Sequence, residues 1–262
     1  MCLTIERGVL RCGTERSEPR SNPNYLIQIM LAEGTYLFQS TILRREDGFL
    51  LERIIIFANG ELPDYEKARR VLRAGDTVIC ADGGTRHALA LGLRPDLIVG
   101  DMDSAENRQL LELKKAGVTV DYHSRDKNAT DLELALQRAL GLQPREIIIA
   151  AALGGRLDQT LANITLLANP QLGGFNVRLD DGVEEILLCR DQALVRGRSG
   201  DLVSLIPWQG AVSEVETQGL KWPLRREILY PDKTRGVSNE MVGETASVSI
   251  GSGLLLVVHR RQ

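Results

Sequence analysis

This 262-residue sequence lacks closely spaced cysteine and histidine pairs. Its four cysteines stand alone at positions 2, 12, 80 and 189, and its three histidines are equally scattered. Structural zinc sites need such pairs, so the spacing argues against a zinc site. Isolated cysteines are typical of reduced thiols, and we therefore expect a cytoplasmic protein.

The sequence also lacks an excess of positive charge and any long apolar run. Its formal net charge is −3 and its pI about 5.8, which argues against a broad surface for nucleic acid. No apolar run approaches the roughly 20 residues that span a bilayer, so we expect no membrane partner. With 43% hydrophobic and 26% charged residues, the composition is that of an ordinary globular protein.

Residues 1–52 differ from the rest of the chain in their pattern of charged and apolar residues. The basic start, apolar run and small-residue cleavage site of a signal peptide do not occur there in that order. Acidic residues such as Glu6 and Glu15 argue against an organelle transit peptide. We interpret this segment as an N-terminal extension or poorly ordered arm, within which Met30 offers an alternative start.

Short β-branched runs alternate with helical patterns over residues 53–175. Strands are predicted at 53–58, 77–80, 97–99, 118–121 and 146–151. Helices are predicted at 66–74, 86–91, 105–116, 130–140 and 158–167. This alternation predicts βαβ units, and therefore an α/β domain with a mostly parallel sheet.

Residues 176–262 show only short strand patterns separated by turn residues. Strands are predicted at 185–189, 202–206, 246–250 and 254–258, with no long helix among them. The pattern predicts a second, all-β domain that resembles a sandwich.

Carboxylates follow several strands of the predicted parallel sheet. Asp82, Asp101, Asp103 and Asp158 lie just after strands, and Asp131 opens a helix. Ligands of open parallel sheets bind at the carboxyl ends of the strands, so these side chains can converge on one crevice. Each Asp alone is explained as a cap or turn residue. Asp101 and Asp103 together favour a site for Mg²⁺, which prefers oxygen ligands.

Two glycine pairs occupy strand-to-helix turns. Gly83-Gly84 and Gly154-Gly155 would let the backbone approach a phosphate, although a glycine pair alone is more often a tight turn. Neither pair matches the dinucleotide fingerprint or the P-loop. Arg156, directly after the second pair, could fork onto phosphate oxygens or simply face solvent.

Three further residues carry both an ordinary and a functional interpretation. Lys127 lies in a polar loop before a helix that Thr130 is expected to cap. Trp222 is explained equally well by packing or by stacking on a planar cationic ring. Ser238 is by default a turn residue.

Six motifs occur together in the order found in the thiamine pyrophosphokinase (thiamine diphosphokinase) family, which the chain resembles from about Arg53 to its end. They are Ala81-Asp-Gly-Gly84, Gly100-Asp-Met-Asp-Ser104, Lys127-Asn-Ala-Thr-Asp131, Gly154-Gly-Arg-Leu-Asp158, Gly219-Leu-Lys-Trp-Pro-Leu224 and Ser238-Asn239. Each motif is weak alone, but the ordered set is specific. Residues 1–52 lie outside the resemblance.

The resemblance implies an α/β ATP-binding domain at 53–175 and a thiamine-binding, dimerising β sandwich at 176–262. It implies a homodimer with active sites at the subunit interface. The implied reaction transfers diphosphate from ATP to thiamine with Mg²⁺, giving AMP and thiamine diphosphate.

The resemblance also assigns roles to matching positions. Asp101, Asp103 and Asp131 would hold the metal and act in catalysis, with Asp131 either a metal ligand or the acceptor of the hydroxyl proton. The implied ATP and phosphate contacts are Asp82, Gly83, Gly84, Lys127, Thr130 and Arg156. The implied thiamine contacts are Asp158 and, from the partner subunit, Trp222 and Ser238.

Two positions depart from the family pattern. Asn128 stands where the family usually has Asp, which removes one negative charge and leaves the number of metal ions open. Gln159 stands where the family usually has His, so no proton-transfer role belongs there. Two other functions stay open, a metal-dependent nucleotide phosphohydrolase and an inactive module that binds nucleotide or thiamine.

Overall fold

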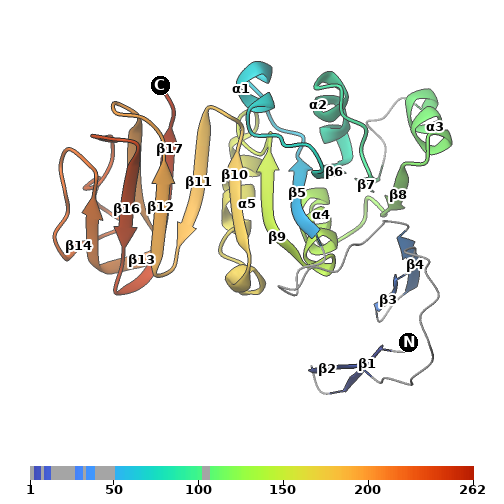
Figure 1. Cartoon of the computed structure of the whole chain (residues 1–262), viewed down its shortest axis with the longest axis horizontal. Coiled ribbons are helices and arrows are strands. Elements are labelled where there is room, and N and C mark those ends of the chain that lie inside the picture. The colour runs from blue at the N-terminus through green and yellow to red at the C-terminus, as the bar shows by residue number, and fades with distance from the viewer. Residues whose placement is uncertain (1–2, 7–8, 13–26, 32–33, 39–50, 102–106) are drawn as a thin grey trace, which may run out of the picture. The chain divides into compact units, whose positions relative to one another are not determined.

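The computed structural model describes residues 3–6, 9–12, 27–31, 34–38, 51–101 and 107–262 (Figure 1). The chain forms two compact units, Met1–Arg44 and Arg45–Gln262. The described parts of the first unit are two antiparallel hairpins. One pairs β1 (Leu3–Glu6) with β2 (Val9–Cys12), and the other pairs β3 (Ile27–Leu31) with β4 (Gly34–Phe38). The predicted extension at 1–52 therefore contains regular strands.

The second unit begins with a parallel sheet whose strands run in the order β9, β5, β6, β7 and β8. Their bounds are β5 (Leu51–Phe57), β6 (Thr77–Ala81), β7 (Leu97–Gly100), β8 (Thr119–Tyr122) and β9 (Pro144–Ala150). Ile54, Ile55, Ile56 and Phe57 are completely buried, because helices cover both faces of this sheet. The mostly parallel α/β half is confirmed.

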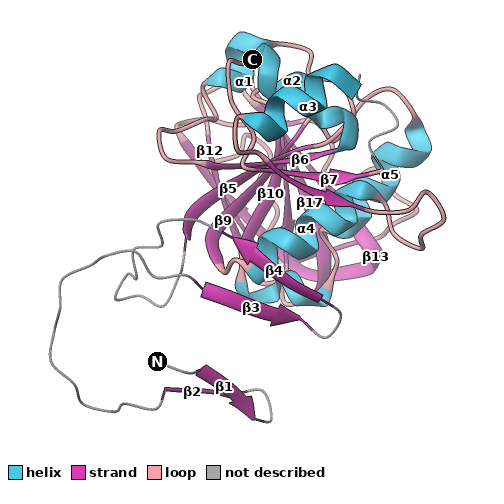
Figure 2. Cartoon of the chain, turned by 90° about the vertical axis from the view of Figure 1, so that its right-hand side faces the viewer, coloured by secondary structure: helices cyan, strands magenta, loops and turns pink. Residues whose placement is uncertain are grey.

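Helices lie on both sides of the parallel strands (Figure 2). The helices are α1 (Tyr65–Arg69), α2 (Thr85–Ala90), α3 (Asn107–Lys115), α4 (Asp131–Gly141) and α5 (Leu157–Leu166), with 3₁₀ turns η1 (Asp82–Gly84) and η2 (Pro170–Gly174). Ala68 of α1, Ala88 of α2 and Leu110 of α3 share one core cluster with Ile55 and Phe57. On the other side, α4 packs against β5, β6, β7 and β9.

The remaining strands are antiparallel. They are β11 (Glu184–Cys189), β12 (Gln192–Arg196), β13 (Leu202–Gln218), β14 (Glu227–Leu229), β15 (Asn239–Glu240), β16 (Thr245–Ser249) and β17 (Ser252–Arg260). β13 pairs first with β17 and then with β16, and a second core cluster that includes Val203, Val215 and Val248 lies among these strands. The antiparallel β-rich half is confirmed.

Strand β10 (Asn176–Asp180) joins the two halves into one hydrogen-bonded sheet. It pairs in parallel with β9 and antiparallel with β11. The sheet therefore crosses the expected domain boundary at 175/176 without a break. The division into an ATP-binding and a thiamine-binding domain stays a prediction.

Some predicted elements differ in length from those in the structure, among them one helix and one strand with a clear physical reason. The helix predicted at 66–74 ends at Arg69. Arg53 donates a hydrogen bond to the carbonyl oxygen of Val71 (2.9 Å), which holds the chain in a turn before β6. The strand predicted at 202–206 continues to Gln218. Its register with β17 shifts between Trp208 and Ser213, so the residues that indicated a turn form a bend within one strand.

Candidate active site

The carboxyl ends of β6 and β7 bring Asp82 and Asp131 together. Asp82 follows β6 with a φ of 42°, and Asp131 is the first residue of α4. Both lie against Gly100, the last residue of β7. A β-carbon built on Gly100 would lie 2.9 Å from Asp82 Cβ and 3.1 Å from Asp131 Oδ1. The structure thus places these two strand-end carboxylates near one another, and Asp101 follows Gly100 directly. Their convergence with the other predicted carboxylates on one crevice stays a prediction.

Basic side chains accompany these carboxylates. Lys127 Nζ lies 2.5 Å from Asp131 Oδ1, and both side chains are largely buried. Arg125 Nε lies 3.6 Å from Asp101 Oδ2. Arg125 lies outside the six motifs, although its place in the loop after β8 was a usable signal, because the loops that follow the strands carry the site. The cations offset the repulsion that closely spaced carboxylates would otherwise feel.

Thr130 caps the helix that carries Asp131. Its hydroxyl accepts a hydrogen bond from the backbone N–H of Glu133 (3.2 Å), and its own backbone is extended. This is the geometry of an N-cap, and it fixes where the first helical residue lies. The predicted capping role of Thr130 is confirmed.

Close packing accounts for the first glycine pair. A β-carbon on Gly84 would lie 2.0 Å from the carbonyl oxygen of Phe57, and one on Gly83 would lie 2.5 Å from the side chain of Asn59. The turn after β6 thus needs glycine to pass the end of β5, whether or not a phosphate binds. Arg86 of α2 donates to the carbonyl oxygens of Asn59 (3.2 Å) and Gly60 (2.9 Å) and ties the two strand ends together.

Arg156 and Asp158 form an exposed ion pair at the start of α5. Arg156 Nη2 lies 2.5 Å from Asp158 Oδ2. The hydrogen bond from Arg156 lowers the pKa of the Asp158 carboxyl, and the pKa of the guanidinium is raised in turn by Asp158. Both groups are therefore charged at neutral pH and open to solvent.

The residues expected to reach thiamine from the β-rich half lie on its surface. The Trp222 side chain is 49% exposed, and Lys221 Nζ lies 4.7 Å from its ring centroid, so one ring face already meets a cation. Asn239 holds this loop through hydrogen bonds with the backbone N–H (3.1 Å) and carbonyl (2.7 Å) of Trp222. Ser238 is exposed, with a φ of 56°.

Asp103 lies outside the described residues, so its place relative to Asp101 and Asp131 stays a prediction. Among the residues that the structure describes, no group of three or more His, Cys, Asp or Glu side chains could hold a metal ion. None of the described helices is long and apolar enough to cross a membrane.

Comparison with known proteins assigns both halves of the chain. A model described as "Thiamin pyrophosphokinase, catalytic domain" matches residues 68–188, and "Thiamin pyrophosphokinase, vitamin B1 binding domain" matches residues 191–255. Thiamine pyrophosphokinase of Bacillus subtilis (strain 168) is 30% identical over 182 residues, 69% of this chain and 85% of that protein. A 6-hydroxymethyl-7,8-dihydropterin pyrophosphokinase of Pyrococcus furiosus is 29% identical over 58% of this chain and 64% of its own length.

Solved structures share the fold. The crystal structure of thiamine pyrophosphokinase from Bacillus subtilis matches with a TM-score of 0.72 and 28% identity, over 80% of this chain and 100% of that one. Yeast thiamin pyrophosphokinase, at 18% identity and a TM-score of 0.65, has the same fold over 80% of this chain. With both domain matches in order and the strand-end carboxylates in place, this chain belongs to the thiamine pyrophosphokinase family.

Proposed function

We propose that the chain transfers the diphosphate of ATP to the hydroxyl of thiamine, giving thiamine diphosphate and AMP. The reaction class is that of its family, an ATP-dependent diphosphotransferase. The observation that carries the proposal is the meeting of Asp82 and Asp131 at Gly100, directly before Asp101. Such a site can receive a nucleotide's phosphates only with help from cations.

The oxygen donors at this edge suit Mg²⁺. Asp131 and Asp101, with Asp103 outside the described residues, offer the carboxylates that this ion prefers, and they leave coordination positions for water and phosphate. Asp101, Asp103 and Asp131 would hold the ion, whose positive charge would offset the negative charge of the phosphates. Asn128 removes one acid beside this set, so we propose no particular number of ions.

Positioning and charge carry most of such a reaction, because phosphoryl transfer needs little covalent help from protein. In the proposed step the thiamine hydroxyl attacks the β-phosphorus of ATP in line, and AMP leaves. Lys127 pairs with Asp131. In this proposal its ammonium group turns toward a phosphate when one binds, and the Asp131 side chain either accepts a hydrogen bond from the hydroxyl or ligates the metal.

The remaining predicted residues divide between the two substrates. We propose that Asp82, Thr130, Arg156 and the backbone of Gly83 and Gly84 contact ATP, with Arg156 released from its exposed pair with Asp158. We further propose that Asp158 contacts thiamine and that Trp222 and Ser238 complete its site from the partner of a homodimer. Cys80 and Cys189 are buried and unbridged, which fits the cytoplasm that we propose as the location.

The acceptor is tested with one assay of AMP formation. The purified protein is incubated with ATP and Mg²⁺ alone, with thiamine, or with 6-hydroxymethyl-7,8-dihydropterin, the acceptor named for the Pyrococcus relative. Thiamine-dependent AMP supports the proposal. AMP with only the pterin would replace thiamine as the acceptor, phosphate release without an acceptor would indicate a hydrolase, and nucleotide or thiamine binding without turnover would indicate an inactive module.

The same assay tests the carboxylates. Asp101→Asn keeps the shape of the side chain but removes its charge, and we expect AMP formation to fall by roughly a hundredfold or more. Asp232→Asn serves as the control, because Asp232 is exposed and pairs with the exposed Lys233 (3.4 Å). Near-normal turnover of a folded Asp101→Asn protein would refute the proposed role of the carboxylates at the ends of the parallel strands.

A further inference from the structure

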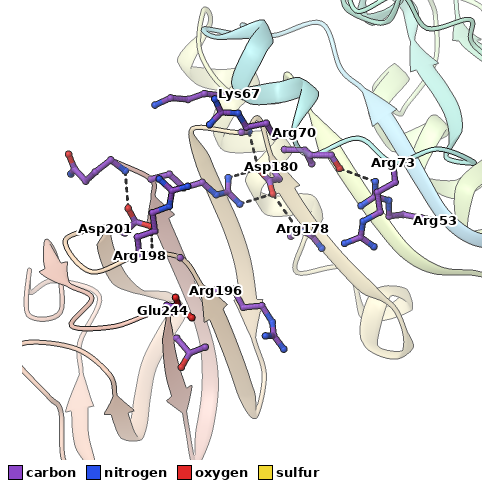
Figure 3. A pocket seen from close by; sticks show the side chains of 16 residues that line it. Arg53, Lys67, Arg70, Arg73, Arg178, Asp180, Arg196, Arg198, Asp201 and Glu244 are labelled. Atoms are coloured by element: carbon purple, nitrogen blue, oxygen red, sulfur yellow. Dashed lines mark hydrogen bonds and ion pairs between the residues drawn. The ribbon is translucent and has the colours of Figure 1, made fainter.

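A basic cavity of about 550 Å³ lies where helix α1 meets the antiparallel half of the sheet (Figure 3). Eight of its lining residues are arginine or lysine, and three are acidic. None of the predicted active-site residues lines it. The charged residues are Arg53, Lys67, Arg70, Arg73, Arg178, Arg196, Arg198, Arg261, Asp180, Asp201 and Glu244.

Among the residues that the structure describes, four of these cations have no side-chain partner. Within residues 51–101 and 107–262, no hydrogen bond or ion pair engages the side chains of Lys67, Arg70, Arg196 or Arg198. Lys67 and Arg70 come from α1 and its end, whereas Arg196 and Arg198 come from the end of β12 and the loop that follows. Figure 3 shows the two pairs on different walls of the cavity. Gathering like charges this way is unfavourable unless something neutralises them.

The acidic lining residues do little to neutralise these four cations. Asp180 is 2% exposed and accepts two hydrogen bonds from Arg261, at 2.7 and 2.9 Å. Asp201 is engaged by His259 (3.0 Å) and by the backbone N–H of Arg198 (2.9 Å). Only Glu244 is left among the described acidic lining residues without such an engagement.

We infer that this cavity is a second anion site, separate from the candidate active site, and that it binds an oligophosphate group. Guanidinium and ammonium groups on two walls match a ligand with several phosphates, since each phosphate can meet a cation from either side. The ligand would hold α1 of the α/β half against the β12–β13 loop of the β-rich half.

The test is a calorimetric titration of the purified protein with inorganic pyrophosphate and with tripolyphosphate, in EDTA. Without a divalent cation, the carboxylates of the candidate active site repel oligophosphate. The binding that is measured is therefore binding to the basic cavity. Lys67→Gln/Arg70→Gln and Arg196→Gln/Arg198→Gln each remove one wall. We expect each double variant to weaken binding by about tenfold or more, since each lost cation costs charge-assisted hydrogen bonds. Circular dichroism verifies that the variants are folded.

The control Arg225→Gln/Lys233→Gln removes the same charge from exposed positions outside the cavity and should bind within about twofold of the unaltered protein. AMP, with one phosphate, should bind far more weakly than pyrophosphate. ATP that binds like tripolyphosphate would make a nucleotide the source of the phosphate chain, and ATP that binds more weakly would favour a free oligophosphate. The inference is overturned if pyrophosphate does not bind, if either wall variant binds normally, or if the control weakens binding equally.

Discussion

Gly100 adjoins two of the carboxylates on which the proposed reaction depends. A β-carbon at this position would press on both Asp82 and Asp131, and the Gly100 φ of 153° is one that side chains rarely allow. The absence of a side chain here lets β7 end next to both residues. No local pattern distinguishes this glycine from the rest of its motif, because the need for glycine arises from contacts with residues 18 and 31 positions away.

Gly100→Ala should therefore damage the site more than the fold. We expect a loss of about 1–3 kcal/mol of stability from the forced backbone and a fall in kcat/KM of about tenfold or more from the displaced carboxylates. Urea unfolding and the AMP assay measure the two effects. Gly92→Ala is the control, because Gly92 also has positive φ (76°) but no atom lies within 4 Å of its added β-carbon. Equal loss of activity in both variants would contradict the argument.

The rule that parallel strands present ligands at their carboxyl ends predicted a common place for Asp82 and Asp131, and the structure has them near one another. Their role in a shared site stays a prediction. The rule could not give the pairing of Lys127 with Asp131 or of Arg125 with Asp101, because loop conformation decides both. The glycine at position 84 is explained by the carbonyl of Phe57, a contact that no local pattern reveals.

Helix α4 is the element that presents Asp131. Its apolar stripe of Leu132, Leu136 and Leu140 predicted the helix, and its start lies within one residue of the prediction because Thr130 supplies a cap. Elements without such local signals were predicted less well. Helix α1 is shorter than predicted because of the contact between Arg53 and the chain after it. Strand β13 is longer than predicted and continues past Pro207 and Gly210, because its pairing with β17 outweighs the turn preference of these residues.

Thr130→Ala should cost about 1 kcal/mol of stability, because the N–H of Glu133 loses its acceptor. The first turn of α4 would fray, so we also expect lower kcat/KM through a less well fixed Asp131. Thr130→Ser retains the hydroxyl and should keep both stability and activity near normal. If the alanine variant loses stability but no activity, the helix start does not position the carboxylate.

At the scale of the whole molecule, a partly buried ion-pair network spans the junction between the two halves of the sheet. Arg178 of β10 contacts Glu146 of β9, and its Nε lies 3.0 Å from Glu185 of β11. Glu185 also forms ion pairs with Arg261 (3.3 Å) and with His259 of β17 (3.2 Å). These partners are up to 76 residues apart, so the sequence could predict two halves but not the charged seam between them. Removing one member leaves its buried partners uncompensated, which is costly.

His259 makes this seam sensitive to pH. Burial opposes its positive charge, but hydrogen bonds with Glu185 and Asp201 outweigh burial, and the pKa of His259 is raised. Its contribution to stability is thus complete below the unfolded pKa, about 6.5, and is lost as pH rises through the higher folded pKa. We expect the free energy of unfolding, measured in urea, to fall across this range in the unaltered protein and to change less in His259→Gln. His87→Gln should keep the slope above pH 6.5, because burial lowers the pKa of His87 and leaves it already neutral there. Parallel curves for the unaltered protein and His259→Gln would show that the proton on His259 does not stabilise the seam.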